Sequence, residues 1–299
     1  MKRDYSKLST ERRNPRTFEL DALPIPEILD VLNEEDAKVA VAVAVEKPRI
    51  VRAVNLLVDR LKKGGRILFV GAGTSGRLGV LEAAELPPTF NTPSTLAQAI
   101  MAGGPECVWA SKEGAEDDED DGAAQLRIRA VHALDAVIGV TASGVTPFVL
   151  GALREAGRKG AARILVSCNR RGVPRDAADV HIAVVVGPEV IAGSTRLKAG
   201  TATKLVLNML TVTTMVRLGK VYENLMVDLQ TRSNKLVARA RRIVATLGGV
   251  PESDASKILR SAGGNAKVAV VMLRRKVTRD QARKLLDRSD GMLRDALES

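Results

Sequence analysis

Short apolar runs alternate with longer segments of helical length through the middle of the chain. Five runs rich in valine, isoleucine, leucine and alanine predict strands at residues 67–70, 97–101, 136–140, 164–167 and 181–186. Glycine-bearing turns separate several of these runs, and helix-like stretches follow them, which is typical of strand–helix–strand units. The pattern therefore predicts an α/β protein with a doubly wound, mostly parallel sheet flanked by helices.

The regions on either side of this alternating core are expected to be helical. Helices are predicted at residues 25–32, 34–62 and 200–218, and shorter helices at residues 254–262, 265–276 and 278–287. We therefore expect three parts: an N-terminal helical segment at residues 1–60, an α/β domain at residues 61–230, and a small helical module at residues 231–299.

A glycine turn with hydroxyl side chains follows the first predicted strand and leads into a helix-like segment. The turn, residues 71–77, reads GAGTSGR. Glycines permit positive φ and let backbone N–H groups approach a ligand, and a helix N-terminus adds partial positive charge. We therefore expect a phosphate-binding loop, with contacts from Thr74, Ser75 and Gly76.

The same turn also matches the G-x-G-x-x-G pattern of dinucleotide-binding proteins. That reading requires an acidic residue at the end of the second strand to hold a ribose. Here residues 82–89 carry their carboxylates on a probable helix and end in a Pro-Pro-Thr sequence. The hydroxyls of Thr74 and Ser75 would crowd a pyrophosphate but suit a phosphate monoester, so the context favours a single phosphate.

A second hydroxyl-rich turn, residues 141–147 with the sequence TASGVTP, follows the third predicted strand. Ligands bind at the carboxyl ends of strands in open α/β sheets, so two such turns on one sheet could converge on one ligand. This predicts further contacts from Ser143, Gly144 and Thr146. The alternative is that Ser143 and Thr146 only cap the next helix.

Long motifs resemble the N-acetylmuramic acid 6-phosphate etherases. They comprise residues 71–77, 82–89 (EAAELPPT), 113–118 (EGAEDD), 187–201 (GPEVIAGSTRLKAGT), 204–209 and 219–228, with shorter matches at residues 10–15 and 33–36. The resemblance spans nearly the whole chain. It implies a sugar isomerase (SIS) type domain, a homodimer, no cofactor, and a lyase that removes D-lactate from a phosphorylated amino sugar to leave N-acetylglucosamine 6-phosphate, in cell-wall amino sugar recycling.

The resemblance also implies two catalytic carboxylates, Glu85 as a proton donor and Glu116 as the second acid/base. Eliminating lactate requires loss of the proton on carbon 2 of the open-chain sugar and protonation of the oxygen leaving carbon 3, and water then adds at carbon 3. We assign Glu85 as the acid and Glu116 as the base. From the residues alone, Glu85 could be an ordinary exposed glutamate. Glu116 lies in an acidic run that usually marks a solvated face, although like charges there would raise its pKa.

A third group of candidate substrate contacts, Glu189, Ser194 and Lys198, follows the last predicted strand. The family motif supports a ligand role for this loop, whereas by chemistry alone Lys198 and Arg196 could be surface charges. One departure from the family pattern is Val145, which stands where the etherases have an arginine. This change removes a possible planar donor for a phosphate or carboxylate.

Composition narrows the remaining classes of function. The formal net charge is +11, but residues 231–299 hold 16 basic and 7 acidic side chains, so the excess is mostly C-terminal. Aromatic residues make up only 2% of the chain, which gives no stacking platform, and no motif predicts nucleic-acid binding. Two cysteines and two histidines show no metal-site spacing. The absence of a long apolar run predicts no membrane span, and we expect a cytoplasmic location.

Two other functions on the same domain type stay open at this point. One is a non-catalytic sugar-phosphate sensor resembling the glucokinase regulatory protein, which would keep the phosphate loops without needing both glutamates. The other is an aldose–ketose isomerase, which also needs a carboxylate base beside an open-chain sugar phosphate. The joint presence of Glu85 and Glu116 favours an enzyme over a sensor, and the long etherase-like motifs weigh against the isomerase.

Overall fold

The computed structural model describes residues 8–230 and 234–298. Two compact units form: the first contains the chain up to Ala83 together with Thr95–Thr211, and the second contains Ala84–Ser94 and the chain from Val212 onward. The boundaries fall inside helices α3 (Gly73–Phe90) and α6 (Lys198–Arg217). The three-part division at residues 60 and 230 stays a prediction.

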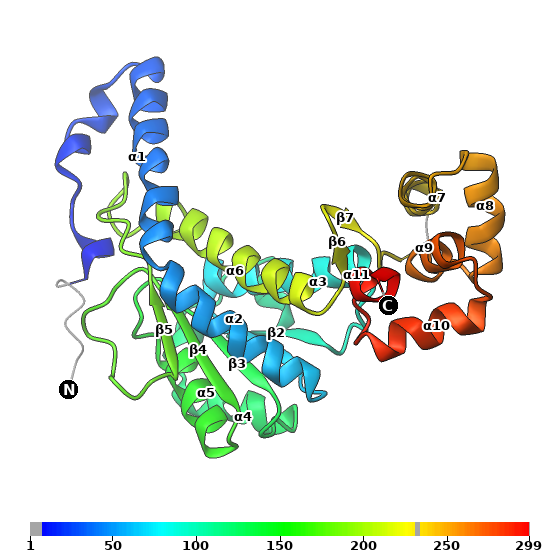
Figure 1. Ribbon diagram of the computed structural model, residues 1–299. Coiled ribbons are helices and arrows are strands. Elements are labelled where there is room, and N and C mark those ends of the chain that lie inside the picture. The colour runs from blue at the N-terminus through cyan, green and yellow to red at the C-terminus, as the bar shows by residue number, and fades with distance from the viewer. Residues whose placement is uncertain (1–7, 231–233, 299) are drawn as a thin grey trace. The chain divides into compact units, whose positions relative to one another are not determined.

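The first unit contains a five-stranded sheet in which every neighbouring pair is parallel (Figure 1). Its strands are β1 (Ile67–Gly71), β2 (Ala97–Met101), β3 (Ala136–Val140), β4 (Ala162–Ser167) and β5 (Val180–Ala183), in the order β2-β1-β3-β4-β5. All five expected strands are present. The last ends at Ala183 rather than at residue 186, because its pairing with β4 ends where Ser167 lies opposite Ala183.

Helices cover both faces of this sheet, which confirms the doubly wound α/β class. Helix α2 (Lys47–Lys62) packs against β3, β4 and β5. On the opposite face, α4 (Glu119–Ile128) and α5 (Pro147–Arg158) bury one apolar core with alternate strand residues such as Leu68, Val70 and Val137. Side chains alternate between faces along a strand, and Phe69 accordingly lies against Gly79 of α3.

The break between the two N-terminal helices lies at a different residue from the one that the sequence predicts. From residue 8 onward, the 3₁₀ turns Ser9–Glu11, Pro15–Thr17 and Leu20–Ala22 precede α1, which spans Ile25–Val45 without a break at residue 33. The break comes at Glu46 instead, because Pro48 at the start of α2 would clash with the carbonyl of a preceding turn. The buried Glu46 carboxylate accepts hydrogen bonds from the side chains of Arg49 and Arg170 and from the N–H of Ala183.

A charged cluster pins the amino ends of β1 and β3 together. Asp135 is fully buried and accepts hydrogen bonds from the backbone N–H groups of Arg66 and His132, at 2.9 and 3.1 Å. The Arg66 guanidinium adds bonds from Nε at 3.1 Å and from Nη2 at 2.7 Å. Burial alone would raise the pKa of Asp135, but these hydrogen bonds outweigh it and lower the pKa.

Besides the ends of α3 and α6, the described part of the second unit contains a short antiparallel hairpin and helices α7 to α11. The hairpin pairs β6 (Val221–Tyr222) with β7 (Leu225–Met226), and the helices are α7 (Asn234–Gly248), α8 (Glu252–Ser261), α9 (Ala266–Arg275), α10 (Arg279–Arg288) and α11 (Leu293–Glu298). These helices share one apolar core. Helices α8, α9 and α10 confirm the three short helices expected there. None of the helices in the described residues combines the length and hydropathy of a membrane span.

Candidate functional site

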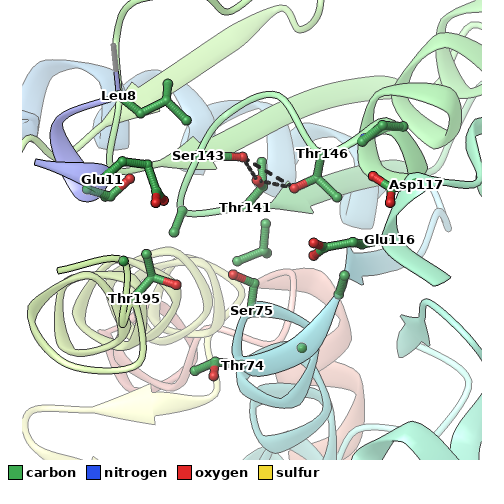
Figure 2. A pocket seen from close by; sticks show the side chains of 17 residues that line it. Leu8, Glu11, Thr74, Ser75, Glu116, Asp117, Thr141, Ser143, Thr146 and Thr195 are labelled. Atoms are coloured by element: carbon green, nitrogen blue, oxygen red, sulfur yellow. Dashed lines mark hydrogen bonds between the residues drawn. The ribbon is translucent and has the colours of Figure 1, made fainter. Parts of the chain in front are cut away.

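The two hydroxyl turns meet at the carboxyl edge of the sheet and line one cavity of about 270 Å³ (Figure 2). Strands β1 and β3 are neighbours, and the helices that follow them, α3 and α5, cover opposite faces of the sheet. Their turns therefore flank the point where the winding of the chain reverses, which is where doubly wound sheets bind ligands. The sequence-predicted residues that line the cavity are Thr74, Ser75, Glu116, Ser143 and Thr146.

The first turn presents a helix N-terminus to this cavity. Helix α3 begins at Gly73, which lies at a φ of +52° and lines the cavity. The first N–H groups of a helix have no acceptor within the helix and attract anions. Figure 2 shows the Ser75 hydroxyl pointing toward the middle of the cavity, where it adds a donor beside these N–H groups.

Gly76, expected as a phosphate contact, lies behind the turn and does not line the cavity. A methyl group placed on Gly76 would lie 2.4 Å from the Sδ atom of Met101 and 2.7 Å from the carbonyl oxygen of Gly71. The structure therefore requires a glycine there for the close approach of α3 to the ends of β1 and β2.

Replacing Gly76 with alanine should lower the free energy of unfolding by about 1–3 kcal/mol, because the new methyl group overlaps backbone that cannot yield. The measurement is urea denaturation of both proteins. Gly200, in α6, is the matched control, because its added methyl group would meet only ordinary contacts at 3.6 and 3.8 Å. Equal stability of the Gly76→Ala and Gly200→Ala variants would contradict this explanation of Gly76.

The second turn gathers three hydroxyl groups. Thr141 Oγ1 lies 2.7 Å from Thr146 Oγ1 and 3.1 Å from Ser143 Oγ. Thr146 is the N-cap residue of α5, but its side chain bonds no N–H group of that helix, so the capping alternative is wrong for Thr146. Gly144 is buried and donates its N–H to Thr141, which fixes the turn from behind. The cluster faces the first turn across the cavity (Figure 2).

Glu116 brings a carboxylate to the same cavity from a single 3₁₀ turn, Ala115–Asp117. Its side chain points toward the middle of the cavity, between the two hydroxyl turns (Figure 2). Glu116 is exposed overall, but partial shielding of its carboxylate by the protein is the largest cause of a raised pKa, and the neighbouring charges of Asp117 and Glu113 raise it further. The acidic run is therefore largely solvated, as expected, but its Glu116 side chain also lines the cavity.

Glu85 and Val145 lie elsewhere. Glu85 is an exposed residue of α3, ten positions after Ser75, and is not among the residues that line the cavity. Val145 is 7% exposed and packs 3.7 Å from the position that a side chain on Gly172 would take. The Val145 side chain is thus buried and does not line the cavity.

The third candidate group supports the start of α6. Glu189 is fully buried and accepts hydrogen bonds from the N–H groups of Lys198 and Ala199, at 3.0 and 2.9 Å. The buried Lys198 ammonium pairs with Glu35 at 2.5 Å, so Lys198 is not a surface charge. Burial would raise the pKa of Glu35, but hydrogen bonds from Lys198 and Lys38 lower it to about 2. Neither Glu189, Ser194 nor Lys198 lines the cavity, whereas the neighbouring Thr195 does.

The N-terminal segment forms a wall of the cavity that the sequence did not predict. Glu11 lines it, and Figure 2 shows this carboxylate on the side opposite Glu116. Asn169 holds the segment: its Oδ1 accepts from the N–H of Ser9 at 2.9 Å, and its Nδ2 donates to Thr10 Oγ1 at 3.3 Å and to the carbonyl of Ala142 at 3.0 Å. Asn169 therefore ties the segment to the second hydroxyl turn.

The cavity offers hydrogen-bond donors that can bind an anion, but no positively charged side chain. Among the described residues that line it there is no lysine, arginine or histidine. Within residues 8–230 and 234–298, no group of three histidine, cysteine, aspartate or glutamate side chains is placed to hold a metal ion. Cys107 and Cys168 are buried free thiols, and burial raises the pKa of Cys168 to about 12.

Comparison with known proteins decides the family. The chain is 45% identical over 291 residues to an N-acetylmuramic acid 6-phosphate etherase of Clostridium beijerinckii, with 97% of this chain and 96% of that protein covered. An etherase of the same name from Mycolicibacterium smegmatis is 48% identical, with 98% and 99% covered. The chain belongs to the N-acetylmuramic acid 6-phosphate etherase family. A third etherase, from Symbiobacterium thermophilum, is 50% identical, with 90% of each chain covered.

Two further comparisons concern the fold of this etherase-family chain. Residues 49–156 match the sequence profile of the glucokinase regulatory protein N-terminal SIS domain. A crystal structure from Bacteroides fragilis, described as a proposed phosphosugar isomerase involved in capsule formation, aligns with a TM-score of 0.50 at 18% identity, covering 65% of this chain and 91% of that one. Both place the sheet of this family member among SIS-type domains, which confirms the expected fold.

Proposed function

We propose that this chain is an N-acetylmuramic acid 6-phosphate etherase that removes D-lactate from its substrate and leaves N-acetylglucosamine 6-phosphate. One observation carries the proposal: the N–H groups and hydroxyls after β1 and β3, which can bind a phosphate, line the same cavity as the Glu116 carboxylate. The phosphate would bind at the N-terminus of α3 and the hydroxyls of Ser75, Ser143 and Thr146. The sugar carbon chain would then extend toward Glu116.

The reaction needs one base and one acid. Glu116 takes the proton from carbon 2 of the open-chain sugar while Glu85 donates a proton to the ether oxygen on carbon 3, and the carbon–oxygen bond breaks. The products of this step are D-lactate and an unsaturated aldehyde. Water then adds to the double bond: its hydroxyl goes to carbon 3 and a proton returns to carbon 2. The two carboxylates exchange roles in this second step, so both end as they began.

The position of Glu85 on helix α3 supports a homodimer. A helical rise of about 1.5 Å per residue puts Glu85 about 15 Å along α3 from Ser75, and the Glu85 carboxylate does not line the cavity that Glu116 lines. A second copy of the chain would supply Glu85 to the cavity of the first. We therefore propose a homodimer in which each site combines Glu116 of one copy with Glu85 of the other.

The direct test is incubation of the purified protein with N-acetylmuramic acid 6-phosphate and an enzymatic assay for D-lactate. Lactate release by the wild type, and its loss in Glu85→Gln and Glu116→Gln, would support the etherase and both carboxylates. Binding of sugar phosphates without lactate release would instead favour a sugar-phosphate sensor, and interconversion of aldose and ketose phosphates would favour an isomerase.

Mixing the two inactive variants tests the homodimer. If each site takes one glutamate from each copy, a mixed dimer of Glu85→Gln and Glu116→Gln retains one intact site. Random exchange makes half of the dimers mixed, so activity should recover to roughly a quarter of the wild-type value if the sites are independent. Each variant alone is the control. No recovery after exchange shown by mass spectrometry would contradict the shared site.

The remaining expectations from the sequence stay predictions. They are a cytoplasmic location and the absence of nucleic-acid and membrane partners. The phosphorylated sugar substrate itself would be held without a resident cofactor, because the acid/base elimination needs only the two carboxylates and water.

A further inference from the structure

We propose that a second cavity, beside the one that holds the two hydroxyl turns, binds the carboxylate of the lactyl group. This inference rests on the proposed etherase activity. It names the part of the protein that receives the leaving group, and it gives a role to Arg77, the last residue of the glycine turn.

The second cavity has a volume of about 180 Å³ and shares Ala72, Gly73 and Glu116 with the first. It lies between the start of α3, the end of β2 and the segment that contains the 3₁₀ turn Pro105–Val108. Glu116 therefore forms part of the wall common to both cavities. A substrate that fills both would place the atoms near its middle beside this carboxylate.

Arg77 gives the second cavity a fixed positive charge. Its Nε donates to the carbonyl of Val108 at 2.8 Å, and its Nη2 donates to the carbonyl of Cys107 at 2.9 Å. These bonds orient the guanidinium but leave its charge uncompensated, and among the described residues no carboxylate forms an ion pair with it. A half-buried guanidinium without a counterion favours an anionic ligand, and its planar donors suit a carboxylate.

Lys112 adds a second, exposed cation to the same cavity. The carboxylates that face these two cations are Glu113 and Glu116, and neither is ion-paired with Arg77 or Lys112 in the described chain. The first cavity, by contrast, has no lysine, arginine or histidine in its described lining. The two cavities thus differ in donor chemistry: one offers hydroxyls and helix N–H groups, and the other offers cations.

This difference matches the two anionic groups of the substrate. A phosphate monoester suits the N–H groups and hydroxyls of the first cavity, and a carboxylate suits Arg77 in the second. The ether bond on carbon 3 joins the sugar to the lactyl group, so the reacting carbons 2 and 3 would lie at the common wall, next to Glu116. The assignment thus orients the substrate for removal of the proton on carbon 2 by Glu116.

The test compares a ligand that has the lactyl group with one that lacks it. The variants are Lys112→Ala and Arg77→Lys, the second of which keeps the charge but cannot bond both carbonyls and a carboxylate. Lys159→Ala is the matched control, because Lys159 is an exposed lysine of the same unit that lines neither cavity. The measurements are KM for N-acetylmuramic acid 6-phosphate, inhibition by added D-lactate, and calorimetric Kd for N-acetylglucosamine 6-phosphate. Thermal melting checks that each variant folds.

We expect KM to rise about fivefold in Lys112→Ala and about tenfold in Arg77→Lys, with weaker inhibition by D-lactate. The Kd for N-acetylglucosamine 6-phosphate should stay at the wild-type value, because that sugar has no lactyl carboxylate. An unchanged KM in a folded, active Lys112→Ala protein would overturn the inference, as would an equal loss of affinity for both ligands. Absence of lactate release by the wild type would instead refute the proposed etherase activity.

Discussion

Glutamine in place of Glu116 should lower kcat for lactate release by about 10²–10⁴-fold, the usual contribution of one general acid–base group. Glutamine has nearly the same size as glutamate and can still accept a hydrogen bond, but it cannot take a proton from carbon 2. The measurement is the initial rate of lactate release at saturating substrate. KM should change much less than kcat, because the phosphate contacts of the hydroxyl turns remain.

The environment of Glu116 also predicts the direction of the pH dependence. Partial desolvation, with the charges of Asp117 and Glu113, raises its pKa above the ordinary glutamate value. A base works only when unprotonated, so kcat should rise with pH through this raised pKa. Removing one neighbouring charge with Glu113→Gln lowers the pKa and should move that limb to lower pH. Glu106→Gln, which replaces an exposed glutamate outside both cavities, is the control.

For the Glu116→Gln variant itself, an unchanged kcat would show that Glu116 is not part of the mechanism.

Replacing Asp135 with asparagine should lower the free energy of unfolding by about 3 kcal/mol, since breaking a buried ion pair leaves its partner uncompensated. Asp135 is fully buried, and the side chain of its partner Arg66 is 25% exposed. The measurement is urea denaturation at neutral pH. Asp59→Asn is the control, because Asp59 forms an exposed pair with Lys63 and should contribute less than about 1 kcal/mol.

The loss of unfolding free energy in the Asp135→Asn variant should depend on pH. The pKa of Asp135 is lower in the folded protein than the ordinary aspartate value of about 3.9. Its contribution to stability is therefore complete above that value and disappears as the pH falls through the folded-state pKa. The difference between wild type and Asp135→Asn should shrink below about pH 4. A constant difference down to low pH would show that charge is not what Asp135 contributes.

The sheet and its two hydroxyl turns could be predicted because their signals are local. An apolar run bounded by glycine indicates a strand, and the hydroxyls of Thr74, Ser75, Ser143 and Thr146 directly follow such runs. The sequence did not predict the order of the strands, which places β1 beside β3. The expectation that the two turns converge came instead from the rule that open α/β sheets bind ligands at the carboxyl ends of their strands. Glu116 was identified through resemblance, because an acidic run by itself predicts a solvated surface.

The residues that the sequence could not place depend on contacts between distant segments. Asn169 bonds Ser9 across 160 positions of the chain, and no local pattern relates the two. Lys198 looks like a solvated lysine until its partner Glu35, 163 positions away, is known. The role of Gly76 likewise depends on Met101 of a neighbouring strand. Burial and pairing at such positions are properties of the packed protein rather than of the local sequence.

The turn that orients Arg77 also places the chain's single tryptophan. Trp109 directly follows Val108, whose carbonyl accepts a bond from Arg77, and it is 90% exposed. With no other indole in the chain, its ultraviolet emission comes from one place, next to the segment that borders the second cavity. A ligand that alters this segment would alter the emission, so occupancy could be followed on the unlabelled protein in real time.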